Sequence, residues 1–193
     1  GTAESILRSI RPDKKFTDDE AKLLDVCMII HAEHGGGNNS TFTCRVLTSA
    51  ETDTYSAYSS AISSLKGFKH GGANKKVMEM LEFAKRDIEN WEDDNEVADF
   101  LTRVIRKQAG DKSGLIYGMG HAIYTLSDPR AAIIKQNALE LAKGKEIERE
   151  FKLLDAIERL TPEVFERENG ASKQMCANVD LYSGLVYKML GIP

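Results

Sequence analysis

Cysteine is scarce in this sequence: Cys27, Cys44 and Cys176 are the only three among 193 residues, and they lie far apart. No two of them form a Cys-x-x-Cys pair, so we expect neither a disulfide framework nor a cysteine zinc site. A reduced, cytoplasmic setting is therefore the default expectation. The sequence also lacks an apolar run near the roughly 18 residues that a membrane span needs. Because it has no signal-like segment either, we expect no membrane partner.

Positive charge is in deficit as well. The chain has 26 lysines and arginines against 30 aspartates and glutamates, which gives a formal net charge of −4. A nucleic-acid-binding protein normally shows a net basic balance or a basic stripe, so we expect no nucleic-acid partner. The acidic balance does not exclude a small anionic substrate, because a few local arginines can outweigh a mildly acidic surface.

Helical signals dominate the chain. Thr17 and Glu20 have the spacing of a capping box, and the apolar run that follows should end at the glycines 35–37. Asp128-Pro129 places proline at the first position of a helix. Thr161-Pro162 repeats this signature and predicts another helix start.

Strand signals are few. The best candidate is 114–124, which mixes aliphatic and aromatic residues with three glycines, and we expect only a short hairpin or loop there. The hydrophobic content of 41% and charged content of 29% are those of an ordinary globular protein. We therefore predict an all-α fold with glycine-rich connections.

Three of the four histidines stand beside glycines. His34 precedes the glycines 35–37, His70 precedes a glycine pair, and His121 follows Gly120. Glycine adopts positive φ angles freely and lets a ligand or another backbone approach closely. One such histidine could equally be a core residue, but three at glycine-rich breaks between helices favour a functional site.

His31 and His34 share a helix face, as half of a metal site would. The sequence offers no HExxH arrangement and no obvious third ligand, so we predict no metal and a structural role for His31. Asp180 begins an apolar helical stretch. Its local sequence favours a helix N-cap, and a carboxylate base at a helix start is the alternative.

Four segments resemble motifs of the citrate synthase family, in the family's order and at its separations: IHAEHGGGNNS at 30–40, KHGGAN at 69–74, GMGH to DPR at 118–130, and NVDLYSG at 178–184. The resemblance extends from about residue 16 to 193. The 2-methylcitrate synthases, which use propionyl-CoA, share these motifs and are an open alternative.

The resemblance implies condensation of acetyl-CoA with oxaloacetate to give citrate and CoA. By the family's pattern, Asp180 removes a proton from the thioester methyl group and His70 stabilises the enolate oxygen. His121 binds the oxaloacetate carbonyl and acts as its acid, and citryl-CoA is then hydrolysed. His34 and Arg130 also match oxaloacetate-binding residues. No separate cofactor is implied, because acetyl-CoA is a substrate.

The resemblance also implies a CoA-binding loop and a division into domains. The residues implied to receive CoA are Leu115, Ile116, Tyr117, Gly118, Met119, Gly120 and, on a looser match, Lys173. Residues 71–173 resemble the small helical domain, which 1–70 and 174–193 flank as a partial large domain.

A homodimer is expected, and the apolar residues Leu23, Val26 and Ile30 are compatible with its interface. The sequence begins at Gly1 without methionine, and family members continue beyond Pro193 with helices that carry two further arginines for oxaloacetate and citrate. We therefore expect a fragment that lacks these helices and much of the N-terminal large domain. Such a chain should bind the dicarboxylate weakly and turn over slowly or not at all. An inactive CoA-binding or dimerisation fragment is the alternative.

Overall fold

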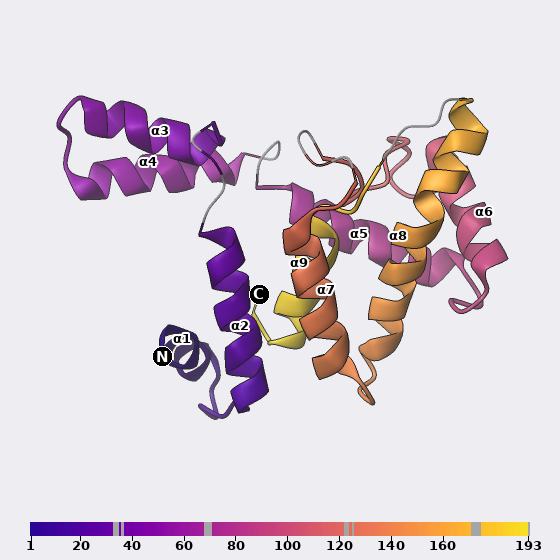
Figure 1. Ribbon diagram of the computed structural model, residues 1–193, viewed down its shortest axis with the longest axis horizontal. Helices are drawn as coiled ribbons and strands as arrows, with labels where there is room; N and C mark the ends of the chain where they lie inside the picture. Colours follow the sequence, from indigo (N-terminus) through magenta and orange to yellow (C-terminus); the bar gives the residue numbers. More distant parts are fainter. Residues whose placement is uncertain are drawn as a thin grey trace.

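The computed structural model describes residues 1–32, 35, 37–67, 71–121, 124, 126–170 and 175–192. Over these residues the chain forms nine helices and no strand, so the all-α prediction is confirmed (Figure 1). The helices are α1 (Thr2–Ile10), α2 (Asp18–His31), α3 (Asn39–Ser49), α4 (Thr54–Lys66), α5 (Ala73–Asp87), α6 (Asp94–Ile105), α7 (Pro129–Ala142), α8 (Glu148–Asn169) and α9 (Asp180–Met189).

Two helix starts follow the local sequence. The Glu20 backbone N–H donates to Thr17 Oγ1 over 3.2 Å, and the Thr17 N–H donates to Glu20 Oε2 over 2.8 Å, so the capping box before α2 is confirmed. Asp128 caps α7, with Pro129 at its first position. In each case the cap satisfies N–H groups that the first helical turn leaves without an intrahelical partner.

The helix start at Thr161-Pro162 is wrong, because both residues lie inside α8. Thr161 is fully buried, and its hydroxyl donates to the Ile157 carbonyl one turn earlier over 2.5 Å. Proline in a helix interior costs about 3 kcal/mol. The buried face of α8 continues through this point to Val164, so the packing of that face outweighs the local signal for a new helix start.

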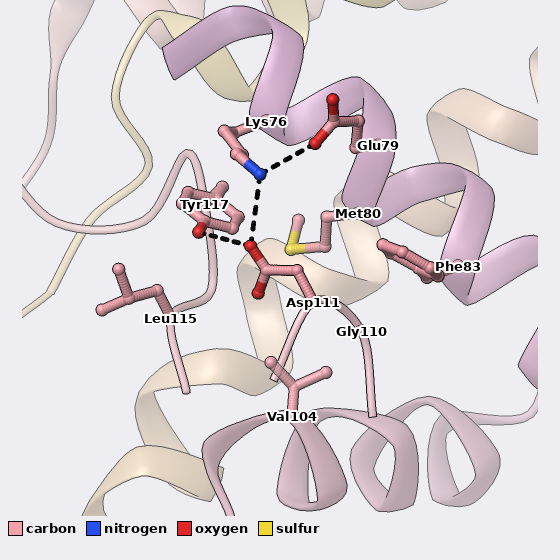
Figure 2. A pocket seen from close by; sticks show the side chains of 9 residues that line it. All are labelled: Lys76, Glu79, Met80, Phe83, Val104, Gly110, Asp111, Leu115 and Tyr117. Carbon is pink, nitrogen blue, oxygen red and sulfur yellow. Dashed lines mark hydrogen bonds and ion pairs between the residues drawn. The ribbon is translucent and has the colours of Figure 1, made fainter. Parts of the chain in front are cut away.

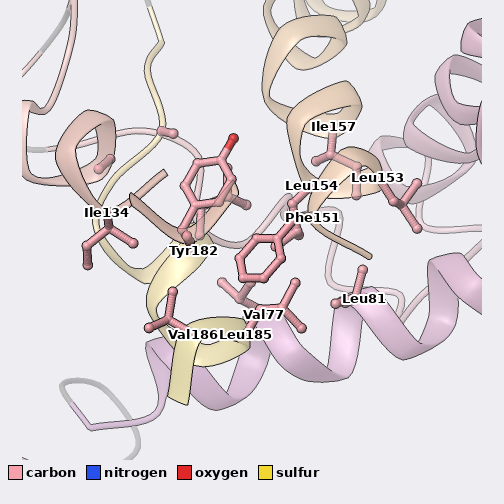
Figure 3. Packing of buried hydrophobic residues seen from close by; sticks show 14 of the residues in the cluster. Val77, Leu81, Ile134, Phe151, Leu153, Leu154, Ile157, Tyr182, Leu185 and Val186 are labelled. Atoms are coloured by element: carbon pink, nitrogen blue, oxygen red, sulfur yellow. The ribbon is translucent and has the colours of Figure 1, made fainter. Parts of the chain in front are cut away.

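The core lies between α5, α7, α8 and α9, and Figure 3 shows their side chains meeting there. α9 packs against the three other helices, and α6 packs along α8. The largest side chains that are completely enclosed include Tyr182, Phe100, Phe151, Leu153, Leu154 and Ile157. Because the first turn of α9 begins at Asp180, this core fixes the position of that residue.

α3 and α4 pack chiefly against each other and project from the rest of the molecule as a helical hairpin (Figure 1). The hairpin exposes many large apolar side chains: Phe42, Val46, Tyr55, Tyr58, Ile62 and Leu65. The apolar dimer surface expected at Leu23, Val26 and Ile30 is partly wrong. Leu23 is only 2% exposed and belongs to the chain's own core. Six of the exposed large apolar side chains are on α3 and α4, while Ile29 on α2 is also 71% exposed.

Two expectations, on the domain boundaries and on membrane spans, depend on which residues the structure describes. The domain division at 70/71 and 173/174 stays a prediction, because His70 and Lys173 lie outside the described residues. Among the described segments, no helix combines the length and the apolar character that crossing a membrane requires.

Candidate active site

The glycine-rich loop after α6 lies against the segment that leads into α9. The Gly120 N–H donates to the Cys176 carbonyl over 2.7 Å, and the Asn178 N–H donates to the Gly118 carbonyl over 2.9 Å. Gly118 has a φ of +82°, and a Cβ there would lie 2.8 Å from Leu181 Cα. Only glycine fits this backbone conformation and this close approach without strain. The loop is therefore held directly against the first turn of α9.

The Asn178 side chain makes the same connection a second time. Its Nδ2 donates to the Gly120 carbonyl over 2.9 Å, while its Oδ1 accepts the Asp180 backbone N–H over 3.0 Å. One amide thus connects the residue before His121 with the first residue of α9. Asn178 lies within the motif at 178–184, but the motif alone predicts no role for it.

Asp180 occupies the first helical position of α9, and Val179 is the N-cap residue. The N-cap interpretation of Asp180 is therefore wrong. A carboxylate in the first turn is favoured by the positive end of the helix dipole. The Asp180 charge also contributes to raised pKa values of Arg130, after the larger effect of Asp128, and of Tyr187, where burial is the main cause.

His121 is oriented by the backbone just after it. Its Nδ1 lies 3.1 Å from the Tyr124 backbone N–H, which donates to it. A neutral imidazole whose Nδ1 accepts carries its proton on Nε2. The Tyr124 ring also lies against the imidazole, with 4.8 Å between the ring centroids. His121 Nε2 is thereby set as a hydrogen-bond donor.

Arg130 is clamped by Asp128. Asp128 Oδ1 accepts from both the backbone N–H and Nε of Arg130 over 3.0 Å, and Oδ2 accepts from Nη2 over 2.8 Å. The Asp128 side chain is fully buried. Burial alone would raise the pKa of Asp128, but its hydrogen bonds with Arg130 outweigh this effect and lower the pKa. The pair also offsets the unfavourable placement of a cation in the first turn of α7.

Sequence reasoning assigned Asp128 only a capping role. The structure adds a positioning role, because the same carboxylate fixes the guanidinium. The available signal was the spacing of two residues between a helix-capping aspartate and an arginine in the first turn.

The clamp brings Arg130 Nη2 to 3.2 Å from His121 Nε2. A guanidinium has donors only, and a neutral imidazole accepts at one ring nitrogen only. With Nδ1 accepting from Tyr124 in a neutral ring, Nε2 and Nη2 are two nitrogen donors that lie 3.2 Å apart. Two such donors suit an oxygen acceptor, such as a carboxylate or carbonyl oxygen of a small anion.

The start of α5 contacts α9 at Ser183 and Gly184, one turn beyond Asp180. Asn74 Nδ2 donates to Ser183 Oγ over 2.7 Å. A Cβ at Gly184 would lie 2.7 Å from Asn74 Oδ1, so the two helices touch where that side chain is missing. The start of α5 therefore lies beside the early turns of α9, which begins at Asp180.

Several other sequence predictions concern histidines and metal. His34, His70 and Lys173 lie outside the described residues, so their positions stay predictions. His31 Nδ1 is 2.7 Å from the Cys27 carbonyl of its own helix, and its structural role stays a prediction. Among the described residues, no group of three or more histidine, cysteine, aspartate or glutamate side chains has an arrangement that could hold a metal ion.

Comparison with known proteins agrees with the motifs. A family model for the citrate synthase C-terminal domain matches residues 1–193. A citrate synthase of Deinococcus radiodurans is 35% identical over 176 residues, which are 91% of this chain and 42% of that protein. A 2-methylcitrate synthase of Shewanella oneidensis is 36% identical over 172 residues, covering 89% of this chain and 40% of that protein.

The fold comparison gives the same result. The crystal structure of citrate synthase from Pyrobaculum aerophilum has a TM-score of 0.72 at 26% identity, over 92% of this chain and 40% of that one. The chain thus spans about two fifths of the length of these relatives. Since the family model matches the chain from its first residue to its last, this protein belongs to the citrate synthase family.

Proposed function

We propose that this chain forms part of an enzyme that condenses acetyl-CoA with oxaloacetate to give citrate and CoA. The observation that carries the proposal is the approach of His121 Nε2 and Arg130 Nη2 to 3.2 Å, with Asp128 holding the arginine. These two donors suit the ketone and carboxylate oxygens of a 2-oxo dicarboxylate. A guanidinium is well matched to a carboxylate.

In the proposed reaction, Asp180 takes a proton from the methyl group of the thioester. His70 donates a hydrogen bond to the enolate oxygen that forms, since donors placed where charge develops are the main source of stabilisation. The enolate carbon attacks the ketone carbon of oxaloacetate, and His121 gives the Nε2 proton to the new alkoxide. Water then cleaves the thioester of citryl-CoA and releases citrate and CoA.

Oxaloacetate is bound in this proposal by His34, His121 and Arg130. Arg130 commits Nε and Nη2 to Asp128, while within the described residues Nη1 makes no hydrogen bond. Nη1 therefore has donors available for a carboxylate. The reaction needs no cofactor, because acyl-CoA is the substrate. The cytoplasmic setting expected from the cysteines stays a prediction.

The experiment uses the full-length reading frame that encodes this chain and measures CoA release and citrate formation. His121→Ala and Asp180→Asn should each reduce kcat by about 10² to 10⁴-fold, as the loss of one general acid or base does. Asp94→Asn is the matched control, because Asp94 forms an exposed ion pair with Arg159 on α6 and α8. Lack of citrate formation by the wild type, or near-normal turnover of His121→Ala, would refute the proposal.

A second candidate is condensation of propionyl-CoA with oxaloacetate to give 2-methylcitrate. The relative from Shewanella oneidensis, described as a 2-methylcitrate synthase, supports it at 36% identity. One methylene in an apolar pocket is worth only about 1–3 kcal/mol of discrimination. The ratio of kcat/KM for acetyl-CoA and propionyl-CoA in the full-length enzyme decides between the two.

A homodimer completes the proposal. The support is the hairpin of α3 and α4, whose exposed apolar side chains include Ile62 at 67% exposure. Ile62→Asp should convert the dimer to monomers in light scattering after size exclusion, since an interface tolerates a buried unpaired charge poorly. Ile133→Asp, on α7 at 43% exposure, is the control and should leave the mass unchanged. A wild-type enzyme that is monomeric at micromolar concentration would end this part of the proposal.

A further inference from the structure

Asp111 is the centre of a side-chain network beside the glycine-rich loop (Figure 2). Its Oδ2 accepts the Tyr117 hydroxyl over 2.7 Å and lies 3.4 Å from Lys76 Nζ on α5. Its Oδ1 accepts the Ser113 backbone N–H over 3.0 Å. One carboxylate thus connects the start of this loop, its middle and the first turn of a neighbouring helix.

The loop is also tied to itself. Ser113 Oγ accepts the Leu115 N–H over 3.1 Å and lies 3.2 Å from the Tyr117 hydroxyl oxygen. Beyond this closed turn, Gly118 and Gly120 are hydrogen-bonded to the segment before α9. The loop between Asp111 and His121 therefore has two separate anchors, and Asp111 supplies the first.

The charges of this network favour its formation at neutral pH. Burial alone would raise the pKa of Asp111, but hydrogen bonds from Ser113 and Tyr117 outweigh it and lower the pKa to about 2. Lys76 pairs with Glu79 as well as with Asp111, and its Nζ lies 5.8 Å from the Tyr117 ring centroid. The carboxylate is therefore ionised and faces three donors, the Ser113 N–H, the Tyr117 hydroxyl and Lys76 Nζ.

The network determines which side chains of the loop face inward. Ile116 is buried and Tyr117 is directed to Asp111, whereas Leu115 is 58% exposed. The cavity behind Tyr117 has a volume of about 10 Å³ and is lined partly by Met80 and Phe83. This space holds no more than about one water molecule. Leu115 also lines this cavity, and a ligand of the loop is too large for it, so such a ligand must lie outside the cavity.

We propose that Asp111 is a positioning residue for acyl-CoA binding, acting through Tyr117 to present the loop 115–120 to the nucleotide part of CoA. This inference rests on the proposed function, in which the enzyme uses acyl-CoA, and on the resemblance of residues 115–120 to the family's CoA-binding loop. It adds that Asp111, which need not touch CoA itself, sets the affinity for CoA through Tyr117. The anchor is separate from the clamp on Arg130, so it should leave oxaloacetate binding unchanged.

The test compares Asp111→Asn and Tyr117→Phe with the control Asp94→Asn in the full-length enzyme. The KM for acetyl-CoA should rise about tenfold in both variants, the size expected for one hydrogen bond to a charged group. The KM for oxaloacetate and kcat should each change less than about twofold, and Asp94→Asn should change neither KM. A parallel rise of both KM values, or an unchanged KM for acetyl-CoA, would overturn the inference.

A binding measurement separates this inference from the proposed function. Calorimetric titration with CoA alone requires no turnover. If the wild type forms no product with acetyl-CoA or propionyl-CoA, the proposed function fails. Weaker CoA binding by Asp111→Asn than by wild type would then still support the anchor. Equal CoA affinity of the two proteins, or no CoA binding by the wild type, would overturn it.

Discussion

Replacing Asn178 by alanine tests the connection between the two chemical parts of the site. The change removes the hydrogen bond from Nδ2 to the Gly120 carbonyl, at 2.9 Å, and that from the Asp180 N–H to Oδ1, at 3.0 Å. A typical hydrogen bond contributes about 0.5–1.5 kcal/mol net, so the two together amount to roughly 1–3 kcal/mol. Both hydrogen bonds are part-buried, so water can only partly replace them at the Gly120 carbonyl and the Asp180 N–H.

The assay is urea unfolding of the chain followed by circular dichroism, with the free energy of unfolding extrapolated to water. Asn178→Ala should lower that free energy by roughly 1–3 kcal/mol. The matched control is Asn169→Ala, which removes one exposed hydrogen bond from Nδ2 to the Phe165 carbonyl at the end of α8. The control should change the free energy by less than about 0.5 kcal/mol.

A second variant, Asn178→Asp, isolates the donor. It keeps an oxygen that can accept the Asp180 N–H, but it places a carboxylate oxygen against the Gly120 carbonyl, where Nδ2 now donates. Two acceptors then face each other, so at neutral pH this variant should be at least as unstable as Asn178→Ala. If both variants behave like Asn169→Ala, the amide carries no net free energy and the argument for a mechanical link is refuted.

Two further predictions concern the same region. Gly118→Ala places a Cβ 2.8 Å from Leu181 Cα at a φ of +82°, so thermal unfolding should show a loss of about 1–3 kcal/mol. Asp128 has a lowered pKa in the folded state, because its hydrogen bonds with Arg130 outweigh the effect of burial. It therefore stabilises the fold above the unfolded-state pKa, and this contribution is lost as pH falls through the folded-state value. In Asp128→Asn, this contribution to the pH dependence of the free energy of unfolding should be absent between about pH 2 and pH 6. An unchanged pH dependence would contradict the clamp.

Helix starts were predictable where the signal is local. The capping box of Thr17 and Glu20 depends only on groups within one turn, and the same is true of Asp128 before Pro129. Thr161 and Pro162 show the limit of this reasoning. Their local pattern is that of a helix start, but the buried face of α8 extends through them, and packing decides the outcome.

The geometry of the site was much less predictable. The motifs predict which residues form the site, but not that Asn178 reaches Gly120 across 58 positions. The Arg130 contact with His121 spans only nine positions, yet it depends on the Asp128 clamp and on the turn at Tyr124. Such contacts arise from the packing of helices and loops and have no periodic signature. They could not be read from local sequence.

The motif glycines have a physical meaning that goes beyond flexibility. Gly118 lets the loop touch Leu181 in α9, and Gly184 lets α5 approach the same helix at Asn74. In both places the missing side chain allows two segments of the proposed site to come closer than any other residue would permit. These glycines should therefore affect stability and catalysis together, because the contact that stabilises the fold also sets the distance between the chemical groups. Asp128 should differ, since loss of its carboxylate removes a helix cap and releases the guanidinium without changing a contact between two segments.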